Sequence, residues 1–224
     1  LLDLINHKIS APITLIIGPT SSISLEEGIK LFQKKFGCSD IVIKGLIDAG
    51  GFGYMHINQH NLKEAKIHFN RLKSKNSGVI MQNFIPQIYK KGELSFVFLQ
   101  GKLSHFFLKV PPYNEERVQA FYGGKSFHFK KSNVPAQIRY IKSSFRKDLD
   151  VTEEEVKNAS LQAQVIYLKI LKLLEKLRIP HPQYLRIDGV MVDSNFVIME
   201  LEGIEPYLEM QEAIMYEFTT YETD

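Results

Sequence analysis

"YLRIDGVMVDSNFVIMELE", residues 184–202, has the pattern of two β-strands joined by a short turn. Apolar, β-branched and aromatic residues fill both flanks, and the turn formers "DSN" at 193–195 separate them. In a strand, side chains two apart share a face, so Glu200 and Glu202 point the same way. We therefore expect strands at 184–192 and 196–202.

The register of this hairpin decides what the acids meet. If "DSN" is a three-residue loop, Val192 pairs with Phe196. Asp188 then lies opposite Glu200, and Arg186 lies opposite Glu202. The hairpin would gather three carboxylates on one patch.

Two interpretations of this patch stay open on spacing alone. Like charges repel unless something neutralises them, and carboxylate oxygens in this number suit Mg²⁺ bridging the phosphates of a nucleotide. In the other interpretation the patch is a solvated sheet face, on which Arg186 pairs with one acid.

A second informative stretch is "DIVIKGLIDAGGFGYMHI", residues 40–57, in which an apolar run ends in Lys44 and then breaks into glycines. It predicts either a hairpin that needs backbone freedom or a phosphate clamp. In the clamp, backbone N–H groups close over an anion while the lysine supplies a charge.

The remaining pattern predicts an α+β protein. Before Pro86 we expect strands at 13–17, 40–44, 54–58 and 78–85 and helices at 24–37 and 62–75, the first with Ser24 as N-cap and Gly37 as its stop. After Pro86 we expect a hairpin at 93–110 and a long helix at 151–177. Thr152 and Glu155 have capping-box spacing at the start of that helix.

Composition limits the class of protein. The 224 residues are 44% hydrophobic with a net charge of +3, which argues against disorder and only weakly for nucleic acid. The single cysteine, Cys38, excludes an internal disulfide and fits a reducing compartment. No apolar stretch reaches the length of a membrane span. We therefore expect a soluble cytoplasmic protein with no membrane partner.

Four segments together carry a resemblance: "IVIKGLIDAGGFG", "IMQNFIPQIYKKGELSF", "SHFFLKVPPYNEERVQAFYGG" and "YLRIDGVMVDSNFVIMELEGIEPYL". Their order and spacing resemble those of the ATP-grasp superfamily, in its bacterial glutathione-synthetase branch, which includes the cycloserine-biosynthesis type. The resemblance spans about residues 13–210. It implies an ATP-grasp fold in which two α+β lobes clamp a nucleotide. The lobes would be residues 1–85, with the remnant of a preceding domain at their start, and residues 86–224.

The resemblance also implies roles for individual residues. Nucleotide contacts would come from a phosphate lysine, a glycine loop, the hinge between lobes and an acid near the ribose: Lys44; Gly50, Gly51 and Gly53; Gln82, Asn83, Phe84 and Ile85; and Glu93. The Mg²⁺ ligands would be Asp188, Glu200 and Glu202. Basic residues near the transferred phosphate or the acceptor would be Lys109, Arg117 and Arg186. Gly45 and Glu202 depart from the family pattern, which often has proline and asparagine there.

The implied activity is ATP-dependent ligation of a small amino-acid or peptide-like carboxylate to an amine or thiol acceptor through an acylphosphate, with ATP and Mg²⁺ as cofactors. One alternative is a nucleotide-binding regulatory protein without ligase activity. A nucleic-acid module is the other, suggested by the pairs Phe106, Phe107 and Phe121, Tyr122, although aromatic residues in strands usually lie in the core. We expect no nucleic-acid partner. The acceptor and self-association into a homo-oligomer stay open.

Overall fold

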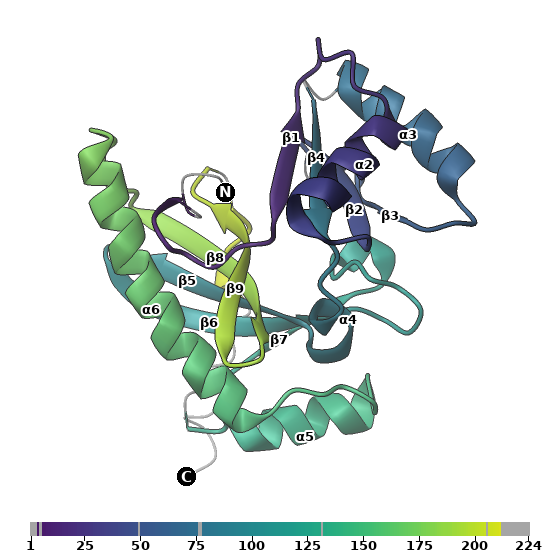
Figure 1. The fold of residues 1–224 in the computed structure, drawn as a ribbon. Coiled ribbons are helices and arrows are strands. Elements are labelled where there is room, and N and C mark those ends of the chain that lie inside the picture. The colour runs from purple at the N-terminus through teal and green to yellow at the C-terminus, as the bar shows by residue number, and fades with distance from the viewer. Residues whose placement is uncertain are drawn as a thin grey trace. The chain divides into compact units, whose positions relative to one another are not determined.

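A computed structural model describes residues 4, 6–48, 50–75, 78–130, 132–204 and 206–211 of the chain. The chain divides into two compact units, one made of residues 12–85 and the other of residues 86 onward together with the N-terminal segment 3–11 (Figure 1). Each unit combines an antiparallel sheet with helices. The predicted α+β class is confirmed.

The first unit is a four-stranded sheet with two helices packed on it. The strand order is β1-β4-β2-β3, and all pairs are antiparallel. Its elements are β1 (Thr14–Ile17), α2 (Leu25–Phe36), β2 (Ile41–Gly45), β3 (Met55–Ile57), α3 (Leu62–Lys75) and β4 (Val79–Asn83).

Local signals set the ends of α2, as the sequence predicts. Ser24 and Glu27 form a reciprocal capping box at its start, and Gly37 ends it with a left-handed φ of 68°. Phe32 of α2 and Phe69 of α3 are both fully buried in one apolar cluster with the strands. Both helices therefore cover the same face of the sheet.

The second unit is a five-stranded antiparallel sheet in the order β7-β6-β5-β8-β9. Its elements are α4 (Gln87–Lys91), β5 (Glu93–Leu99), β6 (Lys102–Val110), a 3₁₀ turn η1 (Ala120–Tyr122), β7 (Lys125–His128), α5 (Val134–Ser144), α6 (Glu153–Lys176), β8 (Tyr184–Val192) and β9 (Asn195–Glu202).

Helix α6 covers one face of this sheet (Figure 1). Its start is fixed by the predicted capping box of Thr152 and Glu155. Its buried stripe packs on alternate strand residues such as Phe96, Phe98 and Ile187. Because strand side chains alternate, the residues between these point to the opposite face. That second face carries the charged residues described below, and we call it the polar face.

Sequence reasoning missed three elements of the second unit: α4, β7 and α5. Helix α4 has five residues and β7 has four, so neither offers enough periodicity to recognise. Helix α5 has a proline in its first turn and a buried apolar side of only three residues, and its N-cap makes no side-chain hydrogen bond. Among the described helices, none has the length and hydropathy to cross a membrane.

Candidate functional site

The β8–β9 hairpin brings three acids together. Its register pairs Asp188 with Glu200 and Arg186 with Glu202. Both cross-strand pairs were predicted from the sequence and are confirmed. The three carboxylates consequently lie on the polar face of the second sheet.

The turn of this hairpin is one residue shorter than predicted. Val192 pairs with Asn195 and not with Phe196, so the predicted three-residue loop is wrong. Asp193 takes a left-handed φ of 52°, as tight two-residue turns require. The pairing shifts farther along the hairpin, where the extra residue Met199 forms a bulge and restores the predicted register.

The bulge decides which way the acids of β9 point. Phe196 and Ile198 are buried in the core against α6. Strict alternation from them would place Glu200 on the same apolar side. The extra residue reverses the alternation, so Glu200 joins Asp188 on the polar face. Gly189 lies beside the bulge, where an added Cβ would come within 2.5 Å of a β9 carbonyl oxygen.

The three acids form a compact set of oxygen donors. Carboxylate oxygens of Asp188, Glu200 and Glu202 all lie within 4.8 Å of one another. Asp188 is fully buried, Glu202 has 26% of its side chain exposed, and Glu200 is exposed. Carboxylate oxygens that converge in this way are the donors preferred by Mg²⁺ and Ca²⁺.

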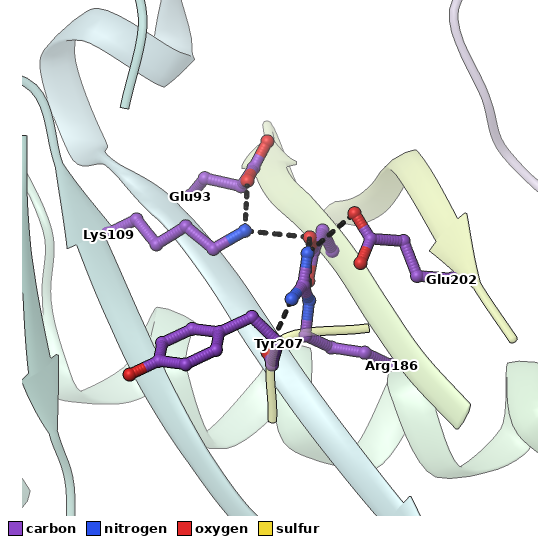
Figure 2. A network of polar contacts seen from close by, with 6 residues as sticks. Glu93, Lys109, Arg186, Glu202 and Tyr207 are labelled. Atoms are coloured by element: carbon purple, nitrogen blue, oxygen red, sulfur yellow. Dashed lines mark hydrogen bonds and ion pairs between the residues drawn. The ribbon is translucent and has the colours of Figure 1, made fainter. Parts of the chain in front are cut away.

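Two cations partly neutralise this cluster (Figure 2). Lys109 Nζ lies 2.7 Å from Asp188 and 3.0 Å from Glu93. Arg186 donates from Nε to Asp188 at 2.9 Å, and its Nη2 lies 2.7 Å from Glu202. With every acid ionised, four carboxylates face two cations and leave a formal charge of −2. The donor set and its residual charge both fit a divalent cation.

The crowding perturbs the protonation of the acids. Burial opposes the charge on Asp188, but Lys109 and Arg186 outweigh it and lower the Asp188 pKa. Burial raises the pKa of Glu93 despite the nearby Lys109. For Glu200, local burial of the carboxylate together with two neighbouring acids raises the pKa to about 7. The Glu200 residue keeps exposed surface, so solvent screens part of the burial effect, and repulsion from Glu202 and Asp188 adds to the shift.

Burial likewise opposes the charge on Lys109, but Asp188 and Glu93 outweigh it and hold the Lys109 pKa above its usual value. Lys109 therefore stays protonated at neutral pH. The cluster consequently keeps a fixed positive charge beside its acids.

Arg117 is held within its own loop. This loop connects β6 to β7, and Glu115 accepts two hydrogen bonds from the Arg117 guanidinium, each 2.8 Å long. The guanidinium also stacks on the Tyr122 ring, with its central carbon 3.4 Å from the ring centroid. Its catalytic role stays a prediction.

The glycine stretch forms the connection of the β2–β3 hairpin, so the hairpin interpretation is confirmed. Lys44 lies near the end of β2 and is partly buried. Gly50 and Gly51 take left-handed φ values of 63° and 72°. At Gly53 an added Cβ would lie 1.7 Å from the Asp48 carboxylate. The left-handed positions favour glycine, and the phosphate-clamp interpretation stays a prediction.

The segment at the end of β4 is tied into the first unit. The Gln82 amide donates to a hydroxyl on β1 at 3.0 Å, and the Asn83 side chain accepts a backbone N–H at 2.8 Å. The Phe84 ring stacks on His56 with centroids 4.1 Å apart, and Ile85 is buried. The predicted adenine contacts of this segment stay predictions.

Sequence reasoning missed a segment that lies on the polar face, residues 206–209, which we call the strap. Three side chains from three strands bind it: Arg186 to the Tyr207 carbonyl oxygen (2.5 Å), His105 to the Leu208 carbonyl oxygen (2.7 Å) and His128 to the Glu209 carboxylate (2.7 Å). Figure 2 shows the first of these contacts. No local spacing predicts them, because the two histidine contacts join residues 103 and 81 positions apart.

Comparison with protein-family models gives one match. Residues 8–150 match the model described as prokaryotic glutathione synthetase, ATP-grasp domain. The matched range includes Lys44, the end of β4 and Arg117, and it ends before the β8–β9 hairpin. A search of curated proteins found no match.

Solved structures resemble almost the whole chain. D-cycloserine synthetase DcsG has a TM-score of 0.68 at 18% identity, over 97% of this chain and 68% of that one. D-alanine–D-alanine ligase from Bacillus anthracis has 0.57 at 14%, over 96% and 59%. The VanG D-Ala:D-Ser ligase from Enterococcus faecalis has 0.54 at 14%, over 94% and 54%. The chain thus spans between 54% and 68% of these chains, and the likeness concerns the fold.

Proposed function

The chain belongs to the family of the prokaryotic glutathione synthetase ATP-grasp domain, and from that premise we propose that it is an ATP-dependent, ADP-forming ligase that joins a carboxylate to an amine or a thiol. ATP would phosphorylate the substrate carboxylate, and the acceptor would displace phosphate from the acylphosphate. The substrate would be a small amino-acid or peptide-like acid.

The observation that carries the proposal is the acid cluster beside Lys109. Asp188, Glu200 and Glu202 would hold one or two Mg²⁺ ions, which supply Lewis-acid neutralisation of the nucleotide phosphates. Phosphoryl transfer depends mostly on positioning and charge neutralisation, so acids that bind the cation and bases that meet the phosphate are the expected equipment.

The bases in this cluster already have defined neighbours. Arg186 spans two of the acids, and its 7% exposed side chain is fixed in place by them. We propose that it keeps Asp188 ionised and oriented. Lys109 lies between Asp188 and Glu93. Its ammonium group would also attract the transferred phosphate.

The other predicted residues complete the proposal. Lys44 and Gly50, Gly51 and Gly53 of the first unit would contact phosphates, the end of β4 would contact adenine, and Glu93 would lie near the ribose. Arg117 would have to exchange its Glu115 contacts for the phosphate or the acceptor. This exchange would break the two hydrogen bonds to Glu115 and could also disturb the stacking on Tyr122.

The experiment that tests the function is a screen for ADP formation in Mg-ATP with single amino acids and short peptides, alone and in pairs. A ligase should release ADP only when a particular carboxylate is present. When the right acceptor is also present, mass spectrometry should detect the product that joins the two compounds. Stabilisation by Mg-ATP with no ADP release for any carboxylate would instead favour the regulatory nucleotide-binding alternative.

A further inference from the structure

The strap places an acidic side chain in the interior of the second unit. Glu209 is 8% exposed, and its carboxylate lies 2.7 Å from Nε2 of His128 on β7. The side chains of this pair are each 9% exposed. Buried carboxylates are rare without dedicated partners. The residues around Glu209 therefore form a site suited to a carboxylate.

The surroundings of Glu209 have the composition of a carboxylate-binding site. His128 of β7 hydrogen bonds to the Glu209 carboxylate, and Ser126 and Lys109 lie close enough to favour its ionised form. Burial opposes ionisation, but these contacts outweigh it and lower the Glu209 pKa. Phe107 lies beside His128 with ring centroids 5.2 Å apart. The site thus combines a charge-assisted hydrogen bond with an adjacent apolar ring.

Apart from the Glu209 carboxylate and the two carbonyl contacts with Arg186 and His105, the strap buries little. Tyr207 is 67% exposed, and Ile204, just before the strap, is 90% exposed. Glu209 takes a left-handed φ of 51°, which is unfavourable for a side chain other than glycine or asparagine. The strap backbone is therefore strained at the residue whose carboxylate pairs with His128.

We infer that this site is a subsite for the carboxylate of a small organic acid, and that Glu209 occupies it as an internal stand-in until such a ligand displaces the strap. The inference rests on the proposed function, since a carboxylate is the substrate class of a ligase of this kind. It adds to that function the location of a subsite for the substrate carboxylate, and it requires Glu209 to leave this subsite before the substrate binds.

The Glu209 site adjoins the acid cluster through two residues. Lys109 contributes charge to Glu209 and bonds directly to Asp188. Arg186 donates to the strap at Tyr207 while it holds Asp188 and Glu202. A carboxylate bound in place of Glu209 would thus lie next to the proposed phosphate site, and displacement of the strap would free one donor of Arg186.

The competition has an expected size. A group tethered by a short flexible segment acts at an effective concentration of the order of millimolar. A free carboxylate must exceed that level to displace Glu209 from the intact chain. When the tethered group is removed, half-saturation should fall by about tenfold or more, because the free acid no longer competes with it.

The test uses Glu209→Gly in the full chain and propionate as the probe. Propionate matches the fragment that this substitution removes, and glycine suits the left-handed backbone at this position. Thermal melting is followed against propionate at constant ionic strength without nucleotide, with propionamide as the uncharged comparison. We expect a saturable rise in melting temperature for Glu209→Gly at about one-tenth of the propionate that the unsubstituted chain requires.

Two controls make the result specific. Adding His128→Phe to Glu209→Gly removes the donor and should abolish the response. Glu175→Ala opens an exposed His–Glu pair elsewhere in the unit, His181 with Glu175 at 3.2 Å, and should create no response. If folded Glu209→Gly shows no saturable response, or responds equally to propionamide, the inference is wrong.

If Glu209→Gly does not fold, hydrogen exchange on the unsubstituted chain tests the inference instead. Propionate above the effective concentration should speed exchange at residues 206–211, and sodium chloride at equal ionic strength should not. Unchanged exchange would overturn the inference. Because neither test contains nucleotide, a negative result leaves Mg-ATP binding to be judged separately, and loss of Mg-ATP binding leaves the propionate result intact.

Discussion

Replacing Lys109 with methionine tests the charge balance of the acid cluster. The substitution replaces the lysine stem with an unbranched apolar side chain one atom shorter and removes the charge. Only 13% of the Lys109 side chain is exposed, and its partners Asp188 and Glu93 have side chains that are 0% and 9% exposed. Removing one partner of a buried ion pair costs about 3–5 kcal/mol. Arg186 still neutralises Asp188 in the variant, so we expect the lower end, about 3 kcal/mol.

The assay is chemical and thermal unfolding of the Lys109→Met variant without nucleotide. A loss of about 3 kcal/mol should lower the melting temperature by about 6–12 °C for a chain of this size. The penalty should shrink as pH falls, because the raised pKa of Glu93 lets that acid take up a proton and lose its uncompensated charge.

The matched control is Lys157→Met. Lys157 pairs with Glu153 one turn away on α6, with side chains that are 62% and 40% exposed, and such pairs contribute about 0.3–0.5 kcal/mol. Equal small losses for both variants, or a penalty at Lys109 that does not depend on pH, would refute the argument that Lys109 compensates buried acids.

Three further predictions follow from the same structure. The pKa of Glu200 is raised to about 7, so the folded state loses stability relative to the unfolded chain as pH rises from about 4.5 toward 7. Glu200→Gln should lack this loss and should melt at a higher temperature than the unsubstituted protein at pH 8 without metal. A melting series from pH 5 to 8.5 measures the difference. Lys44→Ala should reduce the Mg-ATP melting shift far more than Lys90→Ala, an exposed control on α4, and similar shifts would remove Lys44 from the nucleotide site. Arg117→Lys should lower turnover while ATP affinity stays nearly constant, because a lysine cannot reproduce the guanidinium fork, and unchanged turnover in a steady-state assay would make Arg117 a structural residue of its loop.

Much of the fold could be predicted because its signals are local. The N-cap at Ser24, the capping box at Thr152 and the stop at Gly37 depend on neighbours within one turn, and the structure has all three. The hairpin register at Asp188 was predicted correctly from a wrong turn length. A shorter turn and the bulge at Met199 cancel, so the net count of residues between Asp188 and Glu200 gave the right pairing.

The rest depends on contacts between distant residues. No spacing rule predicts that Lys109 bridges Glu93 and Asp188, because the Asp188 contact joins residues 79 positions apart. The strap was missed for the same reason, since His105 and His128 occupy strand positions with no charge pattern around them. Phe106 and Phe107 are buried as core residues, as expected. The same expectation is wrong for Phe121 and Tyr122, because they lie in the short η1 turn and Phe121 is 75% exposed.

The most direct test of the account is isothermal titration of ATP into the protein, with and without Mg²⁺, for the unsubstituted chain and for Glu200→Gln. If the three acids hold the cation that neutralises the phosphates, ATP should bind tightly only with Mg²⁺, and Glu200→Gln should weaken binding by about tenfold or more because the metal loses a charged ligand. Mg²⁺-independent ATP binding, or equal affinity in the two proteins, would contradict the assignment of the acid cluster as a metal site.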